Sequence, residues 1–234
     1  KRPVAGIVER ACLHRPVYVG EPIQLATQIK SLDESTVHYS GEARVRDELV
    51  FELIGALGPL LPMDDFVDEK VVRAQFDELN RPGDWPEEAA LRTPLDESNV
   101  TLDSRVSTLV QFDRVLEHEV GVRVVAEKCL TRAAPYFPDH FPKKPVMPMT
   151  ILLECLMNLG RDFTAQAFPD KPYRVQEMRR IKMNDFLLPS DVVTATLSIK
   201  SHHDDLLVLA CRVSRFDKRV CLLELVMTPE ARVL

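Results

Sequence analysis

The sequence lacks the features that mark membrane proteins, secreted proteins and nucleic-acid-binding proteins. Its 234 residues contain no apolar run of about 18 residues, so no transmembrane helix is expected, and no signal peptide is visible. Acidic and basic residues are interspersed and give a formal net charge of −6, which does not favour nucleic acid as a partner. We therefore expect a cytoplasmic protein that has no membrane span and does not bind nucleic acid.

Paired cysteines and metal-binding motifs are missing as well. The five cysteines are odd in number, form no CxxC pair and stand in apolar segments: Cys12, Cys129, Cys155, Cys211 and Cys221. This pattern is typical of reduced core cysteines. His202 and His203 precede two aspartates, but the repeat described below favours a hairpin turn there over a metal site. We expect neither a metal nor a protein-bound cofactor.

An initiating methionine is also missing, because the chain begins at Lys1. We expect the chain to be a processed product or a part of a larger polypeptide. With 45% hydrophobic residues, it can fill one large core or two small ones.

The most informative stretch that is present runs from Pro135 to Asn158 and reads PYFPDHFPKKPVMPMTILLECLMN. Its prolines predict a stiffened loop around His140, because proline fixes φ and lacks an N–H donor. From Met149 onward the chain is apolar nearly all round, which predicts a helix buried on most sides. Burying Glu154 in such a helix is unfavourable unless the carboxylate has a partner or a task. His140 is a natural candidate for that partner.

This stretch resembles the active-site signature of the 3-hydroxyacyl-(acyl carrier protein) dehydratases of bacterial fatty-acid synthesis. That signature is an aromatic residue, then H-F-P, then P-V-M-P-G, then a helix that carries an acid and, one turn later, glutamine or a similar residue. The matching residues are Phe137, His140, Phe141, Pro142, Pro145, Val146, Met147, Pro148, Glu154 and Asn158. Met149 replaces the family's glycine, and Asn158 replaces its glutamine. The resemblance covers about residues 105 to 230.

The resemblance implies a hydro-lyase that removes water from a 3-hydroxyacyl thioester and leaves a 2-enoyl thioester. We assign His140 as the base at C2 and Glu154 as the acid at C3, a role that needs a protonated carboxyl and therefore burial. Backbone N–H groups at the helix start would stabilise the thioester oxygen. The residues expected to contact the substrate are Phe141, Pro142, Val146, Met149 and Asn158.

The resemblance also implies an acyl carrier protein as partner, with phosphopantetheine carried by the substrate, in fatty-acid or polyketide synthesis. Two basic groups, Lys143–Lys144 and Arg179–Arg180 with Lys182, are candidates for steering that acidic carrier, although solvated surface is their default interpretation. Two other functions stay open, namely an acyl thioesterase and a non-catalytic acyl-binding subunit.

An offset of 170 residues aligns two parts of the chain without a gap, roughly 7 to 56 with 177 to 226. It sets Gly20–Glu21 on Ser190–Asp191 and Lys30–Ser31 on Lys200–Ser201. Both copies resemble the back half of the dehydratase family. An internal repeat of this kind indicates two related structural units in one chain. In the first copy, Ile23, Leu25, Thr27 and Ile29 alternate with polar residues and Ala26, which predicts a half-buried strand.

We therefore predict an α+β double hot-dog fold, in which an antiparallel sheet wraps a long central helix. Residues 1–62 are expected to be the back half of a first unit, and residues 105–234 a complete second unit. The connection at 63–104 is expected to contain a helix over 66–79, capped by Asp65. We expect homo-oligomers or tandem pairing through a continuous sheet, and a first unit completed by residues outside this numbering.

Overall fold

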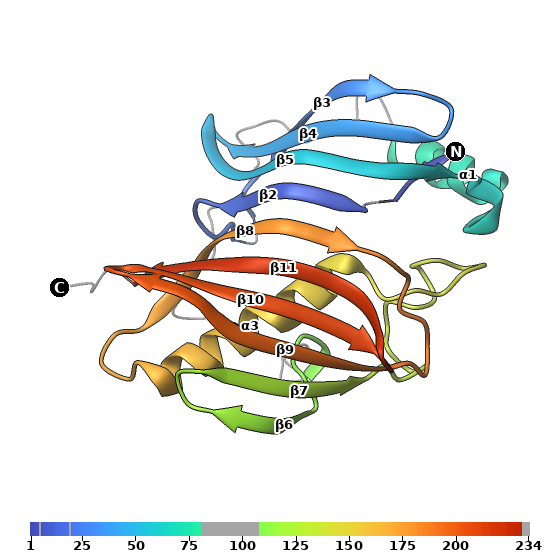
Figure 1. Ribbon diagram of the computed structural model, residues 1–234. Coiled ribbons are helices and arrows are strands. Elements are labelled where there is room, and N and C mark those ends of the chain that lie inside the picture. The colour runs from blue at the N-terminus through green and yellow to red at the C-terminus, as the bar shows by residue number, and fades with distance from the viewer. Residues whose placement is uncertain (5, 19, 81–107, 231–234) are drawn as a thin grey trace.

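An antiparallel sheet of 11 strands dominates the computed structural model, which describes all residues except 5, 19, 81–107 and 231–234 (Figure 1). In chain order the elements are β1 (Arg2–Pro3), β2 (Ile7–Leu13), β3 (Gln24–Leu32), β4 (Thr36–Val45), β5 (Glu48–Leu61), the 3₁₀ turn η1 (Met63–Asp65), α1 (Glu69–Leu79), β6 (Arg114–Glu119), β7 (Arg123–Cys129), α3 (Met149–Ala167), β8 (Tyr173–Met183), β9 (Val192–His203), β10 (Leu206–Arg215) and β11 (Lys218–Pro229). The strand order is β3-β4-β5-β2-β8-β11-β10-β9-β7-β6, and β1 pairs with β5.

The order of the strands is mirrored about the boundary between β2 and β8. Moving outward, β5, β4 and β3 follow β2, and β11, β10 and β9 follow β8. The 170-residue offset relates the matching strands. Adding 170 to the bounds of β4, Thr36–Val45, gives 206–215, which are the bounds of β10. We call β1–β5 the first half of the molecule, and β6–β11 with α3 the second half.

The two halves share one sheet through the antiparallel pairing of β2 with β8, as the repeat predicted. The register obeys the same internal symmetry. Ile7 pairs with Lys182, and Cys12 pairs with Glu177; the 170 offset turns the first of these pairs into the second. Backbone hydrogen bonds along this seam therefore join the two repeats in a single sheet.

The main core lies between α3 and the strands of the second half (Figure 1). The residues that α3 buries are Leu152, Leu153, Cys155, Leu156, Leu159, Gly160, Phe163 and Thr164. Gly160 lets the helix approach the sheet closely, because a Cβ there would lie 2.9 Å from Leu225 Cδ1 and 3.5 Å from Leu209 Cδ1. Val8, Ala11 and Ala56 extend the same core into the first half.

The prediction of a half-buried strand at 23–29 is wrong about burial. β3 forms there, but it is exposed along its whole length, and Leu25 is 80% exposed. β3 is the last strand of the sheet on its side, and its counterpart β9 is followed by β7 and β6. Among the described residues, no further strand pairs with β3. The two halves also differ in the element that comes before the paired strands: β1 precedes β2, whereas α3 precedes β8.

The predicted connecting helix is present but starts later than expected. α1 begins at Glu69, and its N-cap is Asp68, whose side chain accepts a hydrogen bond from the Lys70 N–H; Asp65 lies in η1 instead. The apolar residues Val71, Phe76 and Leu79 of α1 are exposed, with Phe76 at 60%. The rest of the predicted connection, 81–104, lies outside the described residues.

Two further expectations concern turns and membrane spans. His202 and His203 end β9 at the hairpin to β10, so the prediction of a turn is confirmed. Neither described helix has the length and hydropathy needed to cross a membrane.

Replacing Gly160 by valine should destabilise the fold by about 1 to 3 kcal/mol, because the new side chain overpacks the contact with Leu225 and Leu209. Ala165→Val is the matched control, since Ala165 lies on the same helix but is exposed. Urea unfolding followed by circular dichroism measures both changes. Equal losses for the two variants would contradict close packing at Gly160.

Candidate active site

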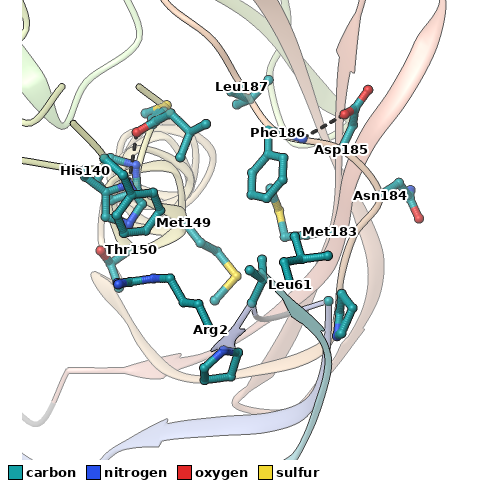
Figure 2. Close-up of a pocket in the computed structure, with 18 residues that line it drawn as sticks. Arg2, Leu61, His140, Met149, Thr150, Met183, Asn184, Asp185, Phe186 and Leu187 are labelled. Carbon is teal, nitrogen blue, oxygen red and sulfur yellow. Dashed lines mark hydrogen bonds between the residues drawn. The ribbon is translucent and has the colours of Figure 1, made fainter. Parts of the chain in front are cut away.

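A cavity of about 430 Å³ lies where the two halves meet at one end of the sheet (Figure 2). The first half lines it with Arg2, Pro3, Val4, Gly6, Pro59 and Leu61. The second half lines it with the His140 loop, the start of α3 and residues 183–187. The lining is mainly apolar and includes few polar groups, which is the usual character of a small-molecule site.

His140 is held in one orientation by its own loop. Its Nδ1 lies 3.0 Å from the Val146 carbonyl oxygen, and its own carbonyl accepts a 2.8 Å hydrogen bond from the Val146 N–H. A carbonyl oxygen only accepts, so Nδ1 must carry the proton in this contact. In the neutral imidazole, Nε2 then has a free lone pair, which is the form needed to take a proton from a substrate.

The loop around His140 packs against the segment that follows β5. Phe141 is buried and meets the ring of Phe66 edge to face, with 5.1 Å between centroids. The Lys143 N–H donates to the Phe66 carbonyl at 3.0 Å. Within the loop, Phe141 and Lys144 exchange two backbone hydrogen bonds of 3.1 Å. Sequence reasoning gave the segment around Phe66 no role at the site.

The N-terminus of α3 opens into the cavity. Pro148 is the N-cap, and its carbonyl accepts from the Ile151 and Leu152 N–H groups at 3.1 and 3.3 Å. Met149 and Thr150, the first two helical residues, line the cavity. Helix geometry leaves N–H groups in this first turn without an intrahelical acceptor, and the helix dipole makes this end positive. The cavity therefore offers donors to an oxygen atom.

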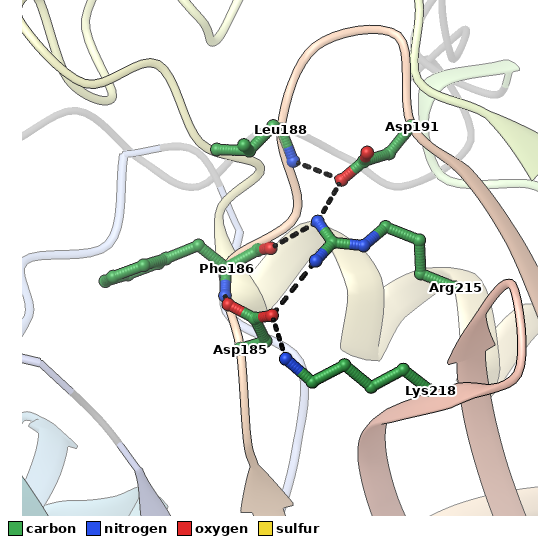
Figure 3. Close-up of polar contacts among 6 residues, drawn as sticks. All are labelled: Asp185, Phe186, Leu188, Asp191, Arg215 and Lys218. Carbon is green, nitrogen blue, oxygen red and sulfur yellow. Dashed lines mark hydrogen bonds and ion pairs between the residues drawn. The ribbon is translucent and has the colours of Figure 1, made fainter.

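Across the cavity from His140 lies a wall formed by the connection from β8 to β9 (Figure 2). A polar network holds this wall in place (Figure 3). Arg215 bonds to Asp191 at 2.8 Å, to Asp185 at 3.0 Å and to the Phe186 carbonyl at 3.3 Å. The Leu187 carbonyl in turn accepts a 2.8 Å hydrogen bond from the Met147 N–H. These bonds fix the wall relative to the His140 loop.

Asp185 lines the cavity, but both of its carboxylate oxygens are engaged. Oδ2 accepts from Lys218 and Arg215 at 3.0 Å each, and Oδ1 accepts from the Phe186 N–H at 2.9 Å. The bond from Lys218 is the largest of several causes that lower the pKa of Asp185. Asp185 is therefore an ionised structural anchor and is poorly suited to donate a proton.

Glu154 does not lie in the position expected for an enclosed acid. Its side chain is 37% exposed, its Oε1 lies 3.5 Å from Arg161 Nη1, and it does not line the cavity. The expectation of burial on most sides of α3 fails at this face of the helix. Asn158 lies on the same face, where it donates to the Val110 carbonyl at 3.0 Å and accepts from Arg161 at 2.7 Å.

The remaining expected site residues divide into two groups. His140, Phe141, Val146 and Met149 line the cavity together, whereas Pro142 is exposed and, like Asn158, is outside the lining. Residues that sequence reasoning missed include Arg2, Met183, Asp185 and Phe186. Residues 183–187 form the end of β8 and the start of its connection to β9, and the turn at 189–190 is a local signal that lies close to them. Arg2 carries no such signal.

Among the described residues, one group of potential metal ligands lies at the end of β2 and on β5. The ligand atoms of Cys12, His14 and Glu52 all lie within 4.8 Å of one another. Glu52 Oε1 already bonds to Arg10 at 2.9 Å, and burial is the main cause that raises the pKa of Cys12. The guanidinium of Arg10 thus already supplies the positive charge that a metal ion would bring to Glu52, and we assign no metal to these residues.

Comparison with protein families and curated sequences points to dehydratases. The ApeI-like family, described as ApeI dehydratase, matches residues 117–221. A 3-hydroxyacyl-(acyl carrier protein) dehydratase FabZ of Roseiflexus sp. (strain RS-1) is 48% identical over 49 residues, 21% of this chain and 34% of the relative. FabZ of Xanthomonas euvesicatoria pv. vesicatoria (strain 85-10) is 30% identical over 118 residues, 46% of this chain and 74% of the relative. The chain thus spans about a third of the first relative and about three quarters of the second.

Solved structures resemble nearly the whole chain at low sequence identity. A tesB protein of Mycobacterium avium subsp. paratuberculosis has 13% identity and a TM-score of 0.62, covering 98% of this chain and 79% of that one. A putative oleoyl thioesterase from Lactobacillus plantarum has 9% identity and a TM-score of 0.58, covering 99% and 77%. A protein of unknown function from Alicyclobacillus acidocaldarius, described as having a hot-dog fold, has 10% identity and a TM-score of 0.56, covering 99% and 80%.

The structural likeness establishes the fold alone, and the sequence relatives establish the family. The His140 loop and the start of α3 lie inside the region that the family match covers. The chain therefore belongs to the hot-dog family of 3-hydroxyacyl-(acyl carrier protein) dehydratases.

Proposed function

We propose that the protein is a hydro-lyase that dehydrates a 3-hydroxyacyl thioester to a 2-enoyl thioester, with His140 as the base. The observation that carries this proposal is the bond from His140 Nδ1 to the Val146 carbonyl. It leaves Nε2 as a proton acceptor in a cavity that the start of α3 also lines. Base and oxyanion donors thus lie in one cavity, as removal of a proton next to a thioester requires.

In the proposed reaction, His140 Nε2 takes the C2 proton, and the electron pair of the C2–H bond moves toward the thioester carbonyl. The oxygen gains negative charge, which N–H groups at the start of α3 stabilise. The electrons then return to form the C2–C3 double bond. Hydroxide leaves C3 and is protonated by an acid, so that one water and one enoyl thioester result.

The acid for this cavity would come from outside the described residues. The carboxylate that lines the cavity, Asp185, is held by Arg215 and Lys218, and Glu154 is outside the lining. We propose a tandem pair of hot-dog units, 1–62 and 105–234, joined by a connection at 63–104. A helix equivalent to α3 would then complete the first unit and supply the acid to His140. Glu154 would be the acid of the symmetric second centre.

An acyl carrier protein, with phosphopantetheine on the substrate, is the proposed bearer of the acyl group. Lys144 supports this proposal, because its Nζ lies 4.7 Å from the ring centroid of Phe186, a cavity-lining residue. Arg179 and Arg180 are less suited to this role, since they bond to Glu177 and Glu224 within the sheet. Positive charge next to a site attracts an acidic carrier through electrostatic complementarity.

Glu154→Gln should keep at least about a third of the wild-type turnover, because it silences a centre that uses Glu154 and spares the His140 cavity. The measurement follows the ultraviolet absorbance of the enoyl product from a 3-hydroxyacyl thioester. A thiol reagent run in parallel detects hydrolysis, which would indicate a thioesterase. Complete loss of dehydration would instead make Glu154 the acid for His140, with two chains paired through residues 105–230.

In the Glu154→Gln background, His140→Ala should lower the remaining turnover by about 10²- to 10⁴-fold, the usual contribution of a general base. His203→Ala in the same background is the control, since His203 lies exposed at a hairpin. It should stay within about twofold of its parent. Turnover that survives the loss of His140 would remove this residue from the mechanism.

Met149→Gly should keep or raise kcat/KM, with the larger gain for bulkier acyl chains. The side chain of Met149 projects into the cavity, and glycine retains the backbone N–H while freeing space (Figure 2). Met149→Leu, which keeps the volume, is the control and should show no gain. A large fall in kcat for the glycine variant would show that the methionine side chain positions the substrate.

A further inference from the structure

Arg2 reaches from the first half of the molecule to the His140 loop. It belongs to β1 and pairs with Leu61 at the end of β5. Its Cζ atom lies 4.0 Å from the ring centroid of Phe141, and the Phe141 ring lies 3.9 Å from that of His140. Figure 2 shows the guanidinium extending toward Thr150 and His140. Arg2 is therefore the cation nearest to the proposed base that the first half contributes to this cavity.

Among the described residues that line the cavity, no anionic side chain is available to pair with Arg2. Asp185, the acid in the lining, is occupied by Arg215, Lys218 and the Phe186 N–H. Burial lowers the pKa of Arg2, so its guanidinium has lost part of its hydration. The positive end of α3 lies in the same cavity. A partly desolvated cation beside a positive helix end is unfavourable unless an anion arrives.

We infer that Arg2 is an anion-binding residue of this cavity that stabilises the negative charge on the thioester oxygen while the C2 proton moves to His140. This inference rests on the proposed dehydration. Phe141 takes up one face of the guanidinium, and the N–H donors lie in the guanidinium plane, where they remain available to an oxygen. The charge of Arg2 then adds to that of the helix N–H groups at the oxygen where charge develops.

The first test is kinetic and uses Arg2→Met, which keeps an apolar contact with Phe141 and removes the charge. The expected result is a fall in kcat of about 10- to 100-fold with KM within about threefold, as for loss of an oxyanion donor. Arg2→Lys should recover part of the loss. Lys1→Met is the control, because Lys1 is the neighbouring cation but bonds to the Glu34 carbonyl. Thermal unfolding of each variant checks the fold.

The second test measures anion binding without turnover. Calorimetric titration with decanoate should show about tenfold or greater loss of affinity in Arg2→Met, whereas binding of neutral decanol should not change. Equal affinity of the variant and the wild type for decanoate would overturn the inference. A rise in KM alone would also overturn it, because it would indicate contact with a remote part of the substrate.

The outcomes separate this inference from the proposed function. A wild-type protein that forms no enoyl product contradicts dehydration, whatever Arg2 does. A wild-type protein whose dehydration depends on His140 but not on the charge of Arg2 contradicts the inference alone.

Discussion

The pairing of β2 with β8 is the interaction on which the candidate site depends. It places the first half of the chain beside the second in a defined register, with Ile7 opposite Lys182 and Cys12 opposite Glu177. Side chains alternate between the two faces of a strand, so a slip of one residue would move every side chain of β2 to the other face. Val8 and Ala11 of β2 belong to the same core cluster as the buried residues of α3, so this register also joins the core of the two halves. The same seam brings β1 and the end of β5 to the His140 loop.

Hydrogen bonds hold the cavity wall that the second half provides in a fixed arrangement. The His140 loop closes on itself through Val146, and it is tied to the β8–β9 connection through Met147 and Leu187. Arg215 holds that connection through two carboxylates and a carbonyl, and it is only 18% exposed, so the network is shielded from solvent better than a surface ion pair. The chemistry assigned to His140 requires such a fixed orientation, since a misplaced base loses rate steeply.

The first half contributes to the site without carrying the family signature. Its strands β2–β5 match β8–β11 one for one, but β3 is exposed along its full length, and the family match covers residues 117–221. What the first half adds is a wall of the cavity and the cation of Arg2. The two halves therefore contribute differently: the second half supplies the proposed base and the start of α3, and the first half supplies packing and the charge of Arg2.

The sequence alone determined the local parts of this structure. The proline-rich loop, the helix from Met149 and the 170-residue repeat follow from backbone restriction and side-chain periodicity, which act over short distances in the chain. Only the tertiary structure decided that Glu154 is partly exposed beside Arg161, that β3 is uncovered, and that Arg2 lies over Phe141. These outcomes depend on which strands become neighbours and which helix face meets the sheet. Periodicity identifies an apolar face but does not identify what will cover it, because that is set by long-range pairing such as that of β2 with β8.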